Sequence, residues 1–235
     1  MTTEQHTALV TGASQGLGYE LASALVARGW HVIVDARTPG PLADAAAQLG
    51  ERATAVAGDI TEPAHRRRLI DAVRNAGRLD LLVNNASTIG ASPMPPLADI
   101  DVATLRSVYD TNVIAPLALV RATLPYLVDV GGAVINISSD AAVEPYEGWG
   151  GYGPSKAALD HATAILAAER PGIGAYAFDP GDMRTALHQA AFPDEDISDR
   201  PEASTVVPAI LRIIDERPAS GRLTVADLVE SEGAA

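Results

Sequence analysis

The sequence predicts an α/β protein with a doubly wound parallel sheet of about seven strands and helices on both faces of the sheet. Two observations carry this prediction. Short apolar runs bounded by turn residues alternate along the chain with longer periodic stretches rich in Ala and Leu. The chain has 235 residues, 47% of them hydrophobic, which is enough to form one sizeable core. Such alternation favours right-handed strand–helix–strand crossovers, and therefore a parallel sheet that is covered on both sides.

The expected elements follow one another in a regular order. Strands are expected near residues 6–11, 31–36, 53–58, 79–84, 132–138, 172–178 and 222–226. Helices are expected near residues 16–28, 40–49, 62–76, 100–128, 152–168 and 204–216. No repeat or linker divides the chain, so we expect a single domain over 1–235. The segment 186–203 leaves the sheet at its carboxyl end, where ligands bind in such folds, and it is a candidate substrate lid.

Composition excludes several classes of function. The 17 basic and 30 acidic residues give a formal charge of -13, which repels nucleic acid. The arginine run at 66–68 falls on an expected amphipathic helix, where a solvated face is the better interpretation. The chain has no cysteine and its five histidines are scattered, so no metal site is expected. The first residues lack the features of a signal peptide and no apolar stretch has the length of a membrane span, so we expect a cytoplasmic protein that binds no membrane.

A glycine-rich segment, TGASQGLG at 11–18, connects the first expected strand to the first expected helix. Gly12, Gly16 and Gly18 stand where the turn needs permissive dihedral angles, close approach to a pyrophosphate and tight helix packing. The phosphates would lie at the helix N-terminus. An ordinary tight turn is the alternative, but the position after the first strand favours a dinucleotide-binding Rossmann fold.

Tyr152 and Lys156 are four residues apart at the start of an expected helix, so both side chains lie on one face. Lys156 is the only lysine in the chain. A tyrosine hydroxyl titrates near ~10 in water, and a lysine and an oxidised nicotinamide would both lower that pKa. Ser139, at the end of a strand, is placed to bond a substrate oxygen. Asn112 is placed to hold a water in a proton relay to Lys156.

With these residues in place, the chain resembles the short-chain dehydrogenase/reductase family, in its single-domain branch with TGxxxGxG and YxxxK motifs. The resemblance extends from Thr7 to about Asp227. The matching pieces occur in the family's order: TGASQGLG at 11–18, Asp59, NNAS at 84–87, Asn112, NISS at 136–139, YGPSK at 152–156 and DPGDMRT at 179–185. One departure is Ser87, where the family more often has glycine, and we expect it to change the backbone beside the cofactor but not the chemistry.

The resemblance implies a catalytic tetrad of Asn112, Ser139, Tyr152 and Lys156. It also implies that Lys156 bonds the nicotinamide ribose, that Asp59 and Ile60 hold the adenine, and that 180–185 borders the carboxamide. The implied cofactor-binding residues are Gly12, Ser14, Gln15, Gly16, Leu17, Gly18, Arg37, Asp59, Ile60, Asn85, Ala86, Tyr152, Lys156, Pro180, Gly181, Met183 and Thr185. A homodimer or homotetramer is implied as well, with the helices at 100–128 and 152–168 at the interface.

The choice of cofactor depends on the end of the second strand, VIVDAR. An acid just past this strand selects NAD, whereas an arginine accommodates the 2′-phosphate of NADP. Ala36 takes the discriminating position, with Arg37 after it and Asp35 one residue early, so we expect NADP rather than NAD. The alternative, in which Asp35 reaches the ribose, stays open, since Gln15 stands where many NADP users carry a basic residue.

The expected function is interconversion of a carbonyl compound and an alcohol by hydride transfer from NADPH, with Tyr152 as general acid/base. One alternative is a dinucleotide-sensing regulator without chemistry, which would not need an intact tetrad. Another is an enzyme acting on a carbon–carbon double bond, for which the Tyr-to-Lys spacing is usually longer. The substrate is a small molecule that the sequence does not identify. Arg184 and His188 either overhang the nicotinamide or are solvated loop residues, and Trp149 is either a wall of the substrate pocket or a packing residue.

Overall fold

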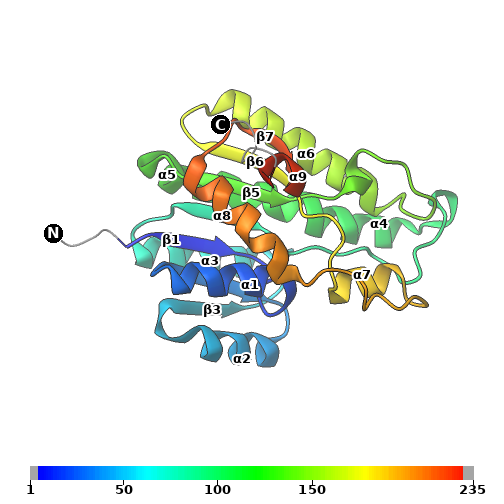
Figure 1. Ribbon diagram of the computed structural model, residues 1–235, viewed down its shortest axis with the longest axis horizontal. Helices are drawn as coiled ribbons and strands as arrows, with labels where there is room; N and C mark the ends of the chain where they lie inside the picture. The colour runs from blue at the N-terminus through cyan, green and yellow to red at the C-terminus, as the bar shows by residue number, and fades with distance from the viewer. Residues whose placement is uncertain (1–4, 230–235) are drawn as a thin grey trace.

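The computed structural model describes residues 5–229, which form one seven-stranded sheet with helices on both faces (Figure 1). The strand order is β3-β2-β1-β4-β5-β6-β7 and every neighbouring pair is parallel. The strands are β1 Thr7–Val10, β2 His31–Ala36, β3 Ala53–Ala57, β4 Leu81–Asn84, β5 Ala133–Ile137, β6 Gly174–Asp179 and β7 Gly221–Thr224. This confirms the predicted doubly wound sheet. Strands β2 and β3 lie on one side of β1, and β4 to β7 lie on the other, so the order in which strands are added reverses between β1 and β4. A crevice opens at this switch point, at the carboxyl ends of the strands.

Two hydrophobic layers sandwich the sheet. The helices are α1 Gly16–Ala27, α2 Pro39–Leu49, α3 Pro63–Ala76, α4 Val102–Tyr109, α5 Ala115–Val130, α6 Tyr152–Glu169, α7 Ala186–Ala191, α8 Val207–Glu216 and α9 Val225–Val229. Alternate strand residues point to opposite layers, as the pleat requires. Val10 packs with α1 and α8, whereas Leu9 packs with α3 and α5. Figure 1 shows α1 and α8 crossing one face and α3 behind it.

The single helix expected over 100–128 differs from the structure in one respect. α4 and α5 are joined by a π-helical turn, Asp110–Ile114, that carries the buried Asn112. A π turn inserts an extra residue into the helix and is often found at functional sites. Sequence periodicity does not reveal it, because the apolar pattern continues through both helices.

The same helical run, Val102–Val130, has the length and apolarity to cross a membrane by composition alone. In the fold, however, Leu119, Val120 and Leu127 are buried in the layer that also contains α3. A core helix of an α/β protein passes the same test. We therefore interpret 102–130 as part of the fold, and it is the one run of this kind within residues 5–229.

Candidate functional site

The carboxyl ends of β1, β2, β4, β5 and β6 border a cleft of about 540 Å³. Most residues expected to bind the dinucleotide line this cleft, from the glycine-rich turn at one end to Met183 and Thr185 at the other. Ser139, Tyr152 and Lys156 line it as well. Two expected residues do not: Gly18 lies under the turn and Asn112 is buried behind the wall. The structure thus brings motifs spread over 170 residues of sequence, from about 12 to about 185, to one edge of the sheet.

The glycine-rich turn fits a pyrophosphate because side chains have no room there. Gly12 and Gly16 adopt φ values of 65° and 58°, in the left-handed region that favours glycine. A Cβ on Gly18 would lie 2.6 Å from Asn85 Nδ2 and 2.7 Å from the Gly12 carbonyl oxygen. Asn85 holds the turn by donating hydrogen bonds to the carbonyl oxygens of Thr11 and Gly12. α1 begins at Gly16 without a side-chain cap, so its first N–H groups can bind an anion.

Asp35 is held beneath the glycine-rich turn. One carboxylate oxygen accepts a hydrogen bond from the backbone N–H of Gly12 at 2.8 Å, and the other lies 2.9 Å from His65 Nε2. Both Asp35 and His65 are 1% exposed. Because Arg68 donates to His65 Nδ1, the imidazole carries its proton on Nε2 and donates it to Asp35. The carboxylate therefore stabilises the turn.

Arg37 is exposed at the rim of the cleft, beside Asp59. Burial raises the pKa of Asp59, but hydrogen bonds from Thr61 and the positive charge of Arg37 outweigh this effect and hold the pKa below its usual value. The arginine run at 66–68 also contributes to this region, against expectation. Arg66 donates to the carbonyl oxygens of Ile60 and Thr61, both at 2.7 Å. It fixes the loop after β3 on which Asp59 lies, a role that charge patterning alone does not indicate.

Lys156 is buried at the junction of β5 and α6. Its side chain is 2% exposed, and Nζ donates a 2.7 Å hydrogen bond to the carbonyl oxygen of Ile137. Burial lowers the pKa of Lys156 to about 8, although the nearby Asp160 carboxylate acts in the opposite direction. Nζ lies 5.4 Å from the centroid of the Tyr152 ring.

Tyr152 is the first residue of α6 and is 6% exposed. Burial raises the pKa of its hydroxyl, and the carboxylates of Asp179 and Asp140 add to this effect. Hydrogen bonding from the hydroxyls of Ser87 and Ser139 acts in the opposite direction. In the absence of a ligand, Tyr152 is therefore protonated at neutral pH.

Ser87 and Asp140 are site residues that the sequence did not identify. Ser87 donates to Asn112 Oδ1 at 3.1 Å, so the residue that replaces the family's glycine bonds Asn112, a member of the expected tetrad, and a hydrogen bond from it lowers the pKa of Tyr152. The Ser139 hydroxyl donates to Asp140 Oδ1 at 2.8 Å. The departure from the family at Ser87 was a usable signal. Nothing in the residue pattern pointed to Asp140.

The side chain of Asn112 connects two walls of the site. Its Oδ1 accepts from the backbone N–H of Thr88, and its Nδ2 donates to the Thr88 carbonyl oxygen and to Ser155 Oγ. These bonds join the loop after β4 to α6. Among the contacts of the described residues, none joins the Asn112 side chain to Lys156 directly.

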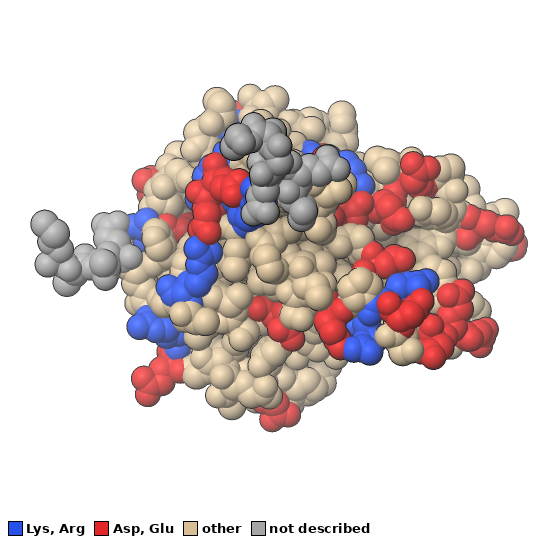
Figure 2. Space-filling model, in the orientation of Figure 1, with Lys and Arg blue, Asp and Glu red and all other residues tan. Residues whose placement is uncertain are grey.

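Trp149 and the first part of the segment 186–203, up to Ala191, line the end of the cleft next to Tyr152. The Trp149 ring lies 5.6 Å from the Tyr152 ring and 5.8 Å from the Phe192 ring, centroid to centroid. The ring of His188, on α7, lies 4.9 Å from that of Phe192 in a tilted arrangement, and the buried Nε2 of His188 has no partner among the described residues. Arg184 forms an ion pair with Glu202. Figure 2 shows acidic side chains, interspersed with a few basic ones, at the end of the molecule that carries α7.

The fold and this cleft define a dinucleotide-binding α/β protein, and the comparisons assign its family. Residues 6–196 match the family model for short chain dehydrogenases, and the chain belongs to this family. It is 34% identical over 199 residues to sepiapterin reductase of Mus musculus, covering 78% of this chain and 76% of that one. It is 36% identical over 170 residues to serine 3-dehydrogenase of Agrobacterium fabrum, covering 72% and 67%.

A solved structure supports the same assignment. The chain superimposes with a TM-score of 0.87 and 27% identity on a short chain dehydrogenase from Escherichia coli CFT073 complexed with NADPH, covering 94% of this chain and 96% of that one. The protein is therefore an oxidoreductase of the short-chain dehydrogenase/reductase family that uses a nicotinamide dinucleotide.

The packing around Gly18 yields a direct test of the phosphate cradle. Replacing Gly18→Ala forces the Cβ into Asn85 and the Gly12 carbonyl, and we expect the affinity for NADPH, measured by fluorescence titration, to fall at least about tenfold. Gly40→Ala is the matched control, because a Cβ at Gly40 in α2 meets nothing within 4 Å. Equal affinities in the two variants would contradict this role of the turn.

Proposed function

We propose that this chain is an NADPH-dependent reductase that interconverts a small carbonyl compound and an alcohol, with Tyr152 as the general acid/base. The observation that carries the proposal is the position of the buried Tyr152 hydroxyl. It lies beside Ser139, in the cleft that begins at the glycine-rich turn, and the Lys156 ammonium lies over the ring that bears it. A dinucleotide sensor would not need a protonated tyrosine beside a buried ammonium. The proposal extends to one functional domain over 1–235 and to a cytoplasmic location.

The chemistry divides between the cofactor and the chain. The bound dinucleotide would supply the hydride to the carbonyl carbon. The Ser139 hydroxyl would turn from Asp140 toward the substrate oxygen and donate a hydrogen bond to it. Tyr152, protonated at neutral pH, would then donate its proton to the same oxygen as charge develops there. The carbonyl becomes an alcohol, and the proton lost by Tyr152 is replaced from solvent.

Lys156 would act on Tyr152 through its charge. With its pKa at about 8, most of the ammonium is protonated at neutral pH, and a cation close to the ring stabilises the tyrosinate left after proton transfer. Its hydrogen bond to Ile137 would keep Nζ in place until a ribose hydroxyl is bound. Asn112 would act as a positioning residue, because its side chain joins the Ser87–Thr88 loop to α6.

NADP rather than NAD is proposed because of the positions of Asp35 and Arg37. Both oxygens of Asp35 are occupied by Gly12 and His65, so this carboxylate is poorly placed to bind a ribose 2′-hydroxyl. Arg37 is exposed at the same rim and has room to pair with a 2′-phosphate. The solved relative complexed with NADPH agrees with this choice.

The other residues that line the cleft would follow the path of the cofactor. Ser14, Gln15, Gly16 and Leu17 would surround the pyrophosphate, and Asp59 and Ile60 the adenine. The residues that would surround the nicotinamide end are Asn85, Ala86, Pro180, Gly181, Met183 and Thr185.

A homodimer or homotetramer is part of the proposal. Exposed apolar side chains on the π turn, α5 and α6, such as Ile114, Leu117 and Ile165, fit the proposed interface.

Tyr152→Phe tests the acid. The substitution removes one hydroxyl, so we expect turnover of carbonyl substrates with NADPH to fall by roughly 10²–10⁴-fold with little change in dinucleotide affinity. The measurement is NADPH oxidation over a panel of ketones and aldehydes. Tyr19→Phe is the control, since it removes an exposed hydroxyl that bonds Gln48 outside the cleft. Retention of most activity in Tyr152→Phe would rule out the proposed acid.

Arg37→Ala tests the choice of cofactor. Loss of a charge-assisted bond to the 2′-phosphate is expected to raise the Michaelis constant for NADPH about tenfold and to leave that for NADH nearly unchanged. Arg74→Ala, which removes an exposed pair with Asp71 on α3, is the control. If Arg37→Ala impairs both cofactors equally, the arginine has a structural role instead.

A further inference from the structure

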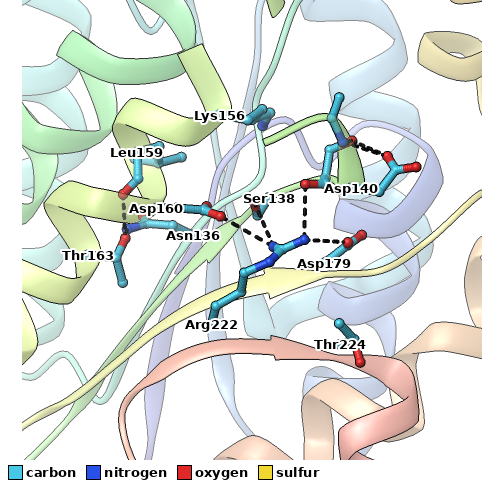
Figure 3. A network of polar contacts seen from close by, with 12 residues as sticks. Asn136, Ser138, Asp140, Lys156, Leu159, Asp160, Thr163, Asp179, Arg222 and Thr224 are labelled. Atoms are coloured by element: carbon cyan, nitrogen blue, oxygen red, sulfur yellow. Dashed lines mark hydrogen bonds and ion pairs between the residues drawn. The ribbon is translucent and has the colours of Figure 1, made fainter. Parts of the chain in front are cut away.

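Arg222 lies on β7, beyond the residues that match the family model, and no motif pointed to it. β7 pairs with β6 so that Arg222 lies opposite Ala177. Its side chain is 26% exposed and reaches toward Ser138 after β5, Asp160 on α6 and Asp179 on β6 (Figure 3).

The guanidinium binds four groups from three segments of the chain. Nη2 donates to Asp179 Oδ2 at 2.8 Å and to the Ser139 carbonyl oxygen at 3.2 Å. Nη1 donates to Asp160 Oδ2 at 3.3 Å and to Ser138 Oγ at 3.4 Å. Figure 3 shows these bonds converging on one side chain. A planar group with fixed donors imposes a geometry on its partners that a single charge does not.

Each partner is connected to the reaction centre. Ser139 bears the hydroxyl proposed to bond the substrate. Asp179 accepts a hydrogen bond from the Gly181 N–H at 3.0 Å, so it holds the turn expected to border the nicotinamide. Asp160 lies one helical turn after Lys156. Arg222 thus contacts three groups at once: the backbone of Ser139, the carboxylate that holds the Gly181 turn, and the carboxylate next to the Lys156 ammonium.

The negative charges of Asp160 and Asp179 also require a cation between them. Asp160 and Asp179 are both largely buried, and Asp160 Oδ1 has no hydrogen-bond partner among the described residues. Burial raises the pKa of Asp160, and the Arg222 charge opposes that shift. Asp179 raises the pKa of Tyr152, and Asp160 raises that of Lys156, so neutralising these carboxylates favours proton release by both groups. The titratable and charged groups around Arg222 and its partners are Tyr152, Lys156 and Asp160 on α6, Asp179 on β6, Asp140 after β5 and Asp227 on α9.

We propose that Arg222 is a positioning residue for the reaction proposed above. It fixes the Ser139 backbone relative to the Gly181 turn and balances the carboxylates of Asp160 and Asp179 next to Lys156. The inference rests on the proposed function for its catalytic consequence, but its electrostatic part concerns groups of this chain alone.

Arg222→Gln and Arg222→Met test the role by kinetics. We expect kcat with NADPH and a reducible carbonyl to fall at least about tenfold, and the affinity for NADPH to change by less than about threefold. The basic limb of the kcat profile, measured from about pH 6 to about pH 10, is expected to move to higher pH because neighbouring groups lose a cation. Arg28→Gln is the matched control, because it removes two hydrogen bonds to the Asp215 carboxylate at the surface. It should leave kcat, the NADPH affinity and the pH profile unchanged.

A second readout needs no turnover. Since Lys156 is the only lysine, NMR of protein made with isotope-labelled lysine follows its titration alone. Arg222→Gln should raise the pKa of Lys156, and Asp160→Asn should lower it. Opposite shifts are not expected from a general loss of packing. If the Gln and Met variants do not fold, Arg222→Lys provides the test, because it keeps the cation but not the planar fork and should lower kcat while leaving the Lys156 titration close to that of the wild type.

The inference is overturned if folded Arg222 variants have the kcat of the wild type and the same basic limb in the pH profile of kcat. It is also overturned if Arg222→Gln leaves the pKa of Lys156 unchanged. A wild-type protein that binds NADPH but reduces no carbonyl would instead contradict the proposed function, and the lysine titration would still decide the role of Arg222.

Discussion

The burial of the Lys156 ammonium is the constraint on which the rest of this site depends. A cation removed from water is costly unless other groups compensate it. The Ile137 carbonyl oxygen accepts one hydrogen bond from it, and the Asp160 carboxylate lies one helical turn away. The bond to Ile137 ties the end of β5 to the first turns of α6. The same junction carries Ser139 on one side and Tyr152 on the other, so the position of the ammonium determines that of both hydroxyls.

The sheet makes this junction part of a larger cleft. Parallel strands end on the same edge, so the glycine-rich turn after β1, the Asn85 loop after β4 and the Gly181 turn after β6 all border one space. Side-chain hydrogen bonds hold the first and the last of these turns. Asp35 holds the first turn from β2, Asn85 holds it from β4, and Asp179 holds the last turn while being held itself by Arg222. The polar bonds beneath the cleft therefore serve to align turns that are far apart in sequence.

The sequence was sufficient to predict the doubly wound sheet, because alternating apolar runs and periodic stretches encode it directly. It was also sufficient to place Tyr152, Lys156 and Ser139 together, because strand ends and helix starts in this fold meet at one edge. The π turn at Asn112 was beyond reach, since an inserted residue leaves the apolar pattern intact. Arg222 and Asp140 were missed for another reason. Their partners are set by the register of β7 and by a local turn, and a pattern of residues does not specify side-chain geometry of that kind.

The titration of Lys156 in the ligand-free protein tests this account most directly. Isotope-labelled lysine reports on this residue alone, and the titration midpoint measures how strongly the site disfavours its charge. We expect a pKa of about 8, with burial as its cause, and a change in the resonance when NADPH is added. A pKa of about 10.4, the value of an exposed lysine, together with a Lys156 chemical shift that NADPH does not change, would contradict the central role of the buried ammonium.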